Sequence, residues 1–390
     1  MKKGQRVHGI DALRAIAMLI GVVFHATLAY KFKRHGGYQP HDDQFHHWLF
    51  DLAGFFMHSF RMPLFFLIAG YFCRFLYYKI GERSFIKHRW KRVGIPFFTG
   101  IILIVPFSLF PCFMYEYIYK NGFSWQEAWK SSFLRMFRPN GVYHLWFLYD
   151  LLMYYGLTVI VMRLKNIPLV RIKFENFTIW WNKMDFTRGY WIVMLSLPIW
   201  LISFFYKDLF VFVDVQFIPK HLSYILFYGY LFGLGWLMEK RQDIFAILIR
   251  NRTLFLVIGA IICLLLFYVE WNKATFYTTV WWSVGKFAAA FQVILFSLGF
   301  IGFFLHYFNV ESYFWRYVSD ASYWVYLTHL SLIVWLQLLF IDSKVPGILR
   351  FPLVLGITVL ITFLTYQWFV RYTFIGDILH GPRKRRKENQ

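Results

Sequence analysis

Long apolar segments alternate with short polar ones along almost the whole chain. Ten of them are long enough to cross a membrane as helices, because a spanning helix needs about 20 mostly apolar residues. They lie at residues 10–30, 60–78, 95–115, 143–162, 189–206, 221–238, 253–270, 281–305, 322–341 and 351–370. The pattern predicts an all-α integral membrane protein with a single bundle of about ten transmembrane helices. We interpret residues 1–390 as one membrane-embedded domain, with a core at about 6–372 and a basic tail at 373–390.

The composition agrees with this interpretation. Hydrophobic residues make up 59% of the chain and charged residues 16%, whereas a soluble domain carries about a quarter charged residues. No small-residue cleavage site follows the first apolar segment, so we expect a retained helix and not a signal peptide. The segment at 46–59 is apolar but interrupted by Asp51 and His58, which predicts an interfacial or partly buried helix before the second span.

Lysine and arginine predict the orientation of the bundle, because loops on the cytoplasmic side carry an excess of both. If both ends are cytoplasmic, the cytoplasmic segments hold 26 of the 42 Lys and Arg residues and the opposite loops hold 12. This bias explains the net charge of +22 without nucleic acid as a partner. The tail sequence "RKRRK" at 383–387 is then expected to anchor on anionic lipid of the bilayer.

The first apolar segment contains ionisable side chains where lipid would disfavour them. Arg14 and His25 are eleven residues apart, which on a helix is three turns plus about 20°, so they share one face about 16 Å apart along the axis. Asp11 lies three residues before Arg14, close enough to orient it. Arg14 could extend to the surface while His25 is a satisfied polar residue between helices. Alternatively, both could face one cavity, because ionisable residues inside membranes usually serve a function.

Further candidate residues lie in or beside four other segments. They are Arg61 and Arg74 around "MPLFFLIAGYFC", Arg89 and Arg92 before the third span, His144, Trp146 and Asp150 in "HLWFLYDLL", and Ser322, Tyr326 and His329 in the ninth span. The arginines before the third span could clamp phosphate or only anchor the chain at the membrane surface. The ninth-span residues are spaced as one helical stripe, which is either helix–helix contact or the wall of a polar cavity.

Histidine and cysteine give no sign of a metal site or a disulfide framework. The loop residues His35, His41, His46 and His47 lack metal-ligand spacing with partners. Cys73, Cys112 and Cys263 are odd in number and lie in apolar surroundings, so we interpret them as inert core thiols.

Five short motifs, in chain order, resemble those of the acyltransferase 3 family of multi-pass membrane acyltransferases. They are "GIDALRAIAMLIGVVFH", "FFLIAGYF", "RVGIP", "HLWFLY" and "ASYWVYLTH". The resemblance covers roughly residues 6 to 372, and the first motif has the Arg and His of the family's first helix at Arg14 and His25. One departure is "YQWFVR", which has Gln367 where close relatives would be expected to have an acidic residue.

The resemblance implies an enzyme of the bacterial inner membrane that uses acyl-CoA as a co-substrate and needs no cofactor. A succinyl group moved to a periplasmic glucan is favoured, and O-acetylation of another envelope polysaccharide or lipid-linked glycan is the alternative. Arg14, Arg89 and Arg92 would hold the donor phosphates. His25 would take the proton of the sugar hydroxyl or carry the acyl group itself, while Arg61, Tyr326 or His329 would stabilise the oxyanion.

Two further points stay open from the sequence. A membrane transporter would also place ionisable residues along a pathway, although no inverted repeat with paired broken helices is recognisable. The oligomeric state is open as well, with a homo-oligomer as one option.

The charge bias yields a topology prediction. A reporter that is active only in the periplasm, fused after Gln390, is expected to stay silent in cells because both ends are predicted to be cytoplasmic. The same reporter fused in the loop at 342–350 serves as the positive control. A strong signal from the terminal fusion would contradict either the even number of spans or the orientation.

Overall fold

The computed structural model describes residues 7–34, 39–138, 141–211, 213, 215–217, 221–272 and 279–383. His35 and residues 384–387 of the basic tail, for which predictions were made, lie outside this part. Within it the regular structure is helical, with two isolated β-bridges, Lys31–His47 and Gly141–Gln216. The all-α membrane fold predicted from the apolar pattern is therefore confirmed.

Among the described residues, eight helical stretches are long and apolar enough to cross a membrane. They are α1 (His8–Thr27, continued by η1, Leu28–Tyr30), α2 (Trp48–Ile80), the run from α3 (Glu82–Arg89) through η2 (Trp90–Gly94), α4 (Ile95–Tyr115) and η3 (Glu116–Lys120), α6 (Trp146–Leu164, preceded by η4, Tyr143–Leu145), α10 (Gln242–Trp271), α12 (Thr279–Tyr307), α13 (Tyr313–Phe340) and α14 (Gly347–Thr365, continued by η5, Tyr366–Val370). The two other predicted spans are shorter apolar helices, α8 (Tyr190–Ser203) and α9 (Leu222–Met238). The count of ten thus remains a prediction.

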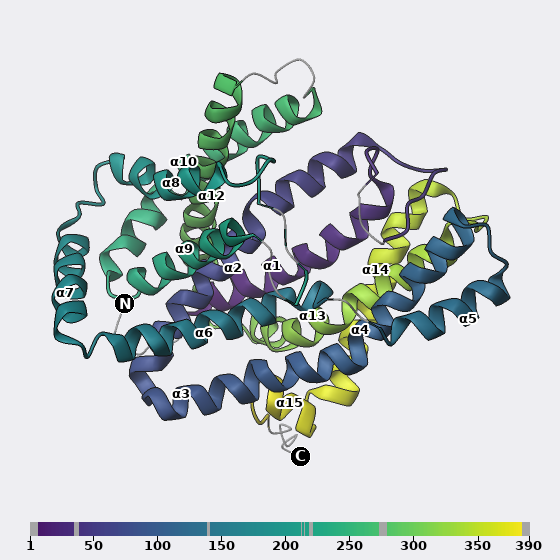
Figure 1. Cartoon of the computed structure of the whole chain (residues 1–390), viewed down its shortest axis with the longest axis horizontal. Coiled ribbons are helices and arrows are strands. Elements are labelled where there is room, and N and C mark those ends of the chain that lie inside the picture. The colour runs from purple at the N-terminus through teal and green to yellow at the C-terminus, as the bar shows by residue number, and fades with distance from the viewer. Residues whose placement is uncertain are drawn as a thin grey trace.

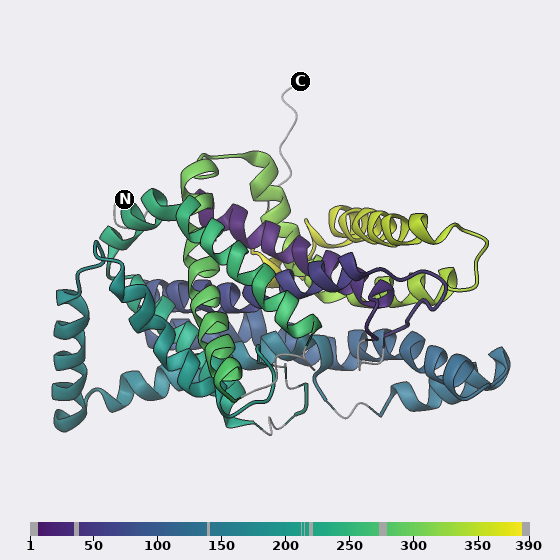
Figure 2. The ribbon, with the colours of Figure 1, turned by 90° about the horizontal axis from the view of Figure 1, so that it is seen from above.

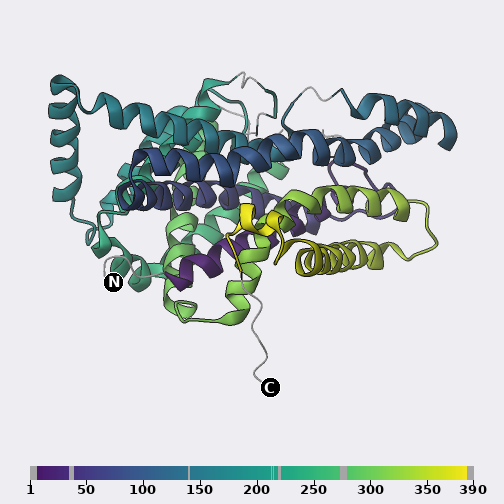
Figure 3. The ribbon, with the colours of Figure 1, turned by 90° about the horizontal axis from the view of Figure 1, so that it is seen from below.

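Several predicted loops are helical instead. Residues 79–94, expected as a loop, form the end of α2, α3 and η2, and η2 leads into α4 without a break. The segment at 46–59 is not a separate helix, because most of it forms the first turns of the 33-residue α2. Three further helices, α5 (Trp125–Met136), α7 (Pro168–Lys183) and α15 (Phe374–Leu379), lie between or after the spans. Figures 1 to 3 show α5 and α7 at opposite ends of the molecule.

Local sequence signals explain two of these extra helices. Ser124 accepts a hydrogen bond from the Glu127 backbone N–H, and the Glu127 carboxylate accepts one from the Ser124 backbone N–H. This capping box satisfies donors at the start of α5. Pro168 is at the first position of α7, where its missing N–H costs nothing. Such signals are too short to be seen by a search for spanning segments.

Helix α1 lies at the centre of the bundle and contacts α2, α12, α13 and α14 (Figure 1). Its buried positions include Ala12, Ala15 and Ala17, whose small side chains allow close approach of the neighbouring helices. Gly9 is closer still, since a Cβ there would lie 2.6 Å from the Phe304 carbonyl oxygen of α12. The Gly9 N–H also donates to Asn309 Oδ1 at 3.1 Å. These contacts fix the position of α1, the helix that carries Asp11, Arg14 and His25.

The three cysteines lie in the described part of the chain, where Cys73, Cys112 and Cys263 are all buried and free. Cys73 lies on α2 with its sulfur 3.8 Å from Thr158 Oγ1 of α6. The interpretation of these residues as core thiols without a disulfide is confirmed.

Helices α2 and α9 pack with their backbones in contact. A Cβ on Gly70 would lie 1.8 Å from the Phe232 carbonyl oxygen, and a Cβ on Gly235 would lie 1.8 Å from the Leu67 carbonyl oxygen. Small residues at a membrane helix interface permit this kind of approach.

This contact predicts different outcomes for two glycines of one helix. Gly235→Ala is expected to destabilise the protein by about 1–3 kcal/mol, because the added methyl must push α9 away from α2. Gly233→Ala is the matched control, since among the described residues no atom lies within 4 Å of a Cβ there. Thermal unfolding in detergent measures both. Equal unfolding midpoints for the two variants would contradict the close α2–α9 contact.

Candidate active site

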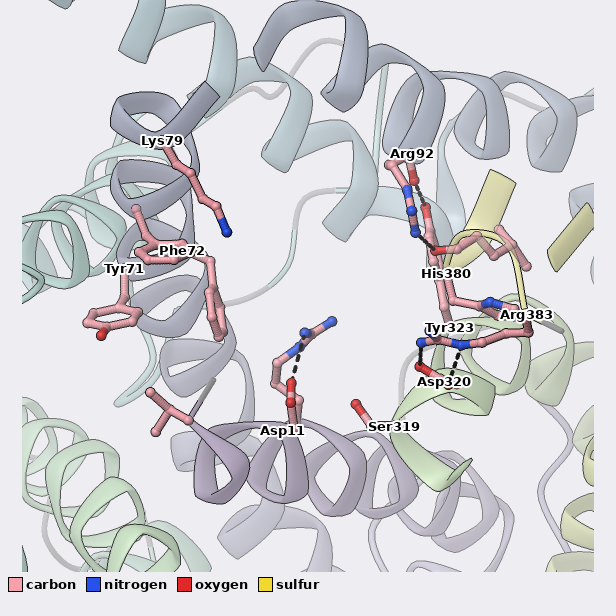
Figure 4. A pocket seen from close by; sticks show the side chains of 14 residues that line it. Asp11, Tyr71, Phe72, Lys79, Arg92, Ser319, Asp320, Tyr323, His380 and Arg383 are labelled. Carbon is pink, nitrogen blue, oxygen red and sulfur yellow. Dashed lines mark hydrogen bonds and ion pairs between the residues drawn. The ribbon is translucent and has the colours of Figure 1, made fainter. Parts of the chain in front are cut away.

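A cavity of about 460 Å³ opens at the end of the bundle where α1 begins. We call it the charged cavity. Its charged lining residues are Asp11 and Arg14 from α1, Lys79 from α2, Arg92 from η2, Asp320 from α13 and Arg383 after α15. Figure 4 shows Lys79 reaching in from one wall, with Arg92 on the opposite wall beside His380 and Arg383. Four cations and two carboxylates give the described lining a formal charge of +2, which suits an anion.

Hydrogen bonds and ion pairs fix the wall around Arg92. Its Nη1 donates to the Leu379 carbonyl oxygen at 3.0 Å, and the Tyr323 hydroxyl donates to the Arg92 carbonyl oxygen at 2.9 Å. Gly381 has a φ of 91°, and a Cβ there would lie 2.6 Å from Arg92 Nη2. The backbone conformation and the close approach both require glycine at this position. The segment after α15 is therefore fitted against Arg92.

Both carboxylates of the charged cavity pair with an arginine. Asp11 Oδ1 lies 3.9 Å from Arg14 Nη1, a loose contact that orients the guanidinium. Asp320 accepts two hydrogen bonds from Arg383, at 2.7 and 2.9 Å. Among the described residues, Lys79 and Arg92 form no ion pair with a carboxylate, so they provide the uncompensated positive charge.

A second, much smaller cavity of about 30 Å³ lies further along α1. We call it the histidine cavity, because His25, His144 and His329 come together there from three elements. The rings of His25 and His329 are 5.3 Å apart between centroids. Arg61, Trp146 and Tyr326 also line it. His144 and His329 are buried.

The hydrogen bonds of two histidines define their tautomers. His329 Nδ1 lies 3.0 Å from the Val325 carbonyl oxygen and 2.8 Å from that of Tyr326. Carbonyls only accept, so Nδ1 carries the hydrogen, which leaves Nε2 as the acceptor of a neutral ring. By the same argument, His144 Nε2 donates to the Leu327 carbonyl oxygen at 3.2 Å. The Tyr326 hydroxyl donates to the His144 carbonyl oxygen at 2.7 Å, so its hydrogen is already engaged.

Arg61 is a buried cation at the edge of the histidine cavity. Its guanidinium lies over the Phe24 ring, 4.8 Å from the centroid, and its Nε has no hydrogen-bond partner among the described residues. Gly21 makes room for this group, because a Cβ there would lie 2.6 Å from Arg61 Nη1. A buried guanidinium with an unbonded N–H group is suited to stabilise negative charge that develops nearby.

The two cavities lie in line between the same three helices. Along α1 the lining passes from Asp11 and Arg14 in the charged cavity to Met18, Gly21 and His25 in the histidine cavity. Helix α13 runs the same way, from residues 319–323 to residues 326–329. Helix α2 runs in the opposite direction, with residues 61–65 at the histidine cavity and 71–79 at the charged one. The predicted shared face of Arg14 and His25 is thus the face that both cavities follow.

An acyltransferase domain matches residues 7–367, nearly the whole chain. The chain belongs to the acyltransferase 3 family. Among curated proteins it is similar to glucans biosynthesis protein C of Escherichia coli strain SMS-3-5 / SECEC, with 34% identity over 163 residues, and to that of strain K12, with 33% over the same length. These alignments cover 42% of this chain and 40% of each relative. No solved structure matches the chain significantly.

The family match confirms the resemblance that the five motifs indicated. It also makes the protein a membrane acyltransferase, since the apolar helices and the domain agree. The match ends at residue 367, so the wall of the charged cavity at Leu379, His380 and Arg383 lies after it.

Four of the predicted site residues of this acyltransferase lie outside both cavities. Arg74 pairs with Glu239 at 3.1 Å and lies over the rings of Tyr78 and Trp236. The Arg89 guanidinium lies over the rings of Phe85 and Tyr155. The buried Asp150 accepts a hydrogen bond from the Tyr224 hydroxyl at 2.5 Å. Ser322 donates to the Ser319 carbonyl oxygen of its own helix at 2.8 Å.

Other lining residues were not predicted from the sequence. Lys79 was counted with a cytoplasmic loop and Arg383 with the basic tail, and Asp320, Tyr323 and His380 were not considered. One weak signal was available, because Asp320 is an acidic residue two positions before the predicted ninth span. Its partner Arg383 lies 63 residues later, a separation at which no local pattern connects two charges.

Proposed function

We propose that this family member moves an acyl group, with succinyl favoured, from cytoplasmic acyl-CoA to a sugar hydroxyl of a periplasmic glucan across a bacterial inner membrane. The observation that carries the proposal is the alignment of a cationic cavity and a histidine cavity along one face of α1. A long donor with phosphates at one end and a thioester at the other matches this arrangement. The relatives named for glucan biosynthesis support the choice of acceptor.

The charged cavity would hold the phosphates of the donor. Arg14 and Arg92 approach it from different helices, and charge-assisted hydrogen bonds from guanidinium to phosphate are among the strongest in proteins. The predicted third donor residue, Arg89, lies outside this cavity, so its proposed role is to add positive charge nearby and not to contact the phosphate.

The histidine cavity would be the place of acyl transfer. His25 would accept the proton of the sugar hydroxyl while its oxygen attacks the thioester carbonyl. The carbon–sulfur bond then breaks, the thiolate of CoA leaves, and the proton on His25 passes to it. Arg61 is the candidate for the oxyanion, because its guanidinium is buried and its Nε has no hydrogen-bond partner in the described part of the chain. The Tyr326 hydroxyl is less suited to this role, since it already donates to a backbone carbonyl.

The acceptor and the acyl group are tested on glycans. Mass spectrometry of periplasmic glucans from cells with and without the gene is expected to show a succinyl ester that depends on the gene. An acetyl ester instead would replace the proposed acyl group. If cells with and without the gene carried the same esters on all envelope glycans, the proposed acceptor class would be wrong.

We expect that removing an arginine of the charged cavity lowers the affinity for acyl-CoA. Arg14→Ala or Arg92→Ala is expected to weaken acyl-CoA binding about 10- to 150-fold, with a smaller effect on the chemical step, because one charge-assisted phosphate contact is lost. Arg14→Lys recovers part of the affinity, since Lys lacks the planar two-pronged geometry. Titration calorimetry on purified protein measures this. Arg163→Ala is the matched control, because Arg163 pairs with Glu82 outside both cavities. Normal donor affinity in both alanine variants would remove the phosphate role.

The chemical step predicts that His25→Gln is inactive although it is folded. Removing a general base lowers turnover by about 10²–10⁴-fold, and Gln keeps hydrogen bonding without basicity. Donor affinity is expected to remain near normal. His329→Gln is the comparison, because its ring lies 5.3 Å from His25 in the same cavity. Single-turnover transfer from acyl-CoA to glucan measures both variants. Full turnover in His25→Gln with loss in His329→Gln would move the base to His329.

A further inference from the structure

The end of α15 and the residues that follow it form one wall of the charged cavity. Leu379, His380 and Arg383 line it, and two independent contacts hold them there: Arg92 to the Leu379 carbonyl oxygen, and Arg383 to Asp320. Figure 4 shows the Asp320–Arg383 pair at the rim of the cavity, next to His380. The acyltransferase domain match ends at residue 367, so the residues of this wall lie outside the matched domain.

In the Asp320–Arg383 pair, the Arg383 guanidinium is held in a geometry that also suits a bound anion. Two parallel N–H groups of Arg383 point to the two carboxylate oxygens of Asp320, at 2.7 and 2.9 Å. A phosphate presents oxygens in the same way, but with more negative charge. The Arg383 side chain is 27% exposed, so an anion in the cavity could reach it. Burial lowers the pKa of His380, so its ring is neutral near pH 7 and the positive charge of this wall comes from the arginines.

The position of the pair along α13 relates it to the proposed reaction. Asp320 precedes His329 by nine residues, which is about 14 Å along the helix axis. Asp320 therefore lies on the side of the charged cavity that faces away from the histidine cavity. Arg14, eleven residues before His25 on α1, lies at a comparable depth on another wall. A donor whose thioester reaches His25 would place its nucleotide at this outer end.

We propose that Arg383 binds the 3′-phosphate of the nucleotide end of acyl-CoA, and that Asp320 is a positioning residue that holds Arg383 in place before the donor binds. The inference rests on the proposed function, because it takes acyl-CoA as the donor. On binding, the phosphate takes over one or both N–H groups of Arg383. Arg14 and Arg92 are then left for the diphosphate, which lies between the 3′-phosphate and the pantetheine arm.

The test compares two ligands that differ by this one phosphate. CoA and 3′-dephospho-CoA are titrated into purified full-length protein, as wild type and as Arg383→Ala, Arg383→Lys and Asp320→Asn. The wild type is expected to prefer CoA. Arg383→Ala is expected to lose about 10- to 150-fold in affinity for CoA and little for 3′-dephospho-CoA, so that the preference disappears. Arg383→Lys keeps part of the preference, because the charge remains without the two-pronged contact.

Two further variants separate ligand binding from a purely structural role of the Asp320–Arg383 pair, in which the pair only holds the end of α15 in place. We call this structural role a latch. Asp320→Asn is expected to bind CoA at least as tightly as wild type, since a carboxylate that competes with the phosphate is removed. A latch would instead make Asp320→Asn and Arg383→Ala lose affinity together, for both ligands. Arg163→Ala removes another arginine–carboxylate pair, in which two N–H groups bond the same Glu82 oxygen, and is expected to leave both affinities unchanged.

The outcomes that overturn the inference differ from those that overturn the proposed function. If wild type binds neither CoA nor 3′-dephospho-CoA, the donor assignment fails, and the role of Arg383 falls with it. If wild type binds CoA but Arg383→Ala keeps the same preference over 3′-dephospho-CoA, the donor assignment stands and the role of Arg383 is wrong. Equal losses for both ligands in Arg383→Ala and Asp320→Asn also overturn it, in favour of a latch.

Discussion

A charge inside a membrane bundle must be paired, bonded to polar atoms or placed at a cavity, and this constraint sorts the ionisable residues of the protein. Arg74 pairs with Glu239, and the Lys286 ammonium donates to the carbonyl oxygens of Ser203 and Tyr206 at the end of α8. These cations are satisfied by the protein itself and stabilise the packing of helices. Arg14 and Arg61 face cavities instead. Arg14 and Arg61 therefore face space that a ligand could enter, whereas Arg74 and Lys286 are already bonded within the protein.

The arrangement of α1, α2 and α13 places the cavity-facing residues along one path, from the charged cavity to the histidine cavity. Helices α1 and α13 present their residues in the same order along the path, while α2 presents them in reverse, and each cavity receives residues from at least four separate parts of the sequence. Small residues make this possible: Gly9 brings α1 against α12, and Gly21 admits the Arg61 guanidinium beside α1. The path thus depends on glycines as much as on charged groups.

The sequence predicted the parts of the site that one helix determines. Arg14 and His25 share a face because of the helical repeat alone, and Tyr326 and His329 line one cavity for the same reason. Ser322 satisfies the same spacing but donates to its own helix, because helical spacing does not determine which groups a hydroxyl bonds. Residues 79–94 were wrongly expected to be a loop, because their charge suggested exposure whereas the backbone continues as a helix. The pair Asp320–Arg383 depends on how the end of the chain folds back, which hydropathy does not encode.

The small volume of the histidine cavity has a consequence for side reactions. At about 30 Å³ it has room for one or two water molecules, far less than a thioester and a sugar together. Side chains from α1, α2 and α13 must therefore separate when substrates enter, and substrates would fill the space they open. An acyl donor that reaches His25 would meet little water before the acceptor arrives. Wasteful hydrolysis of the donor is then limited by the packing of the bundle itself, and not by a separate gate.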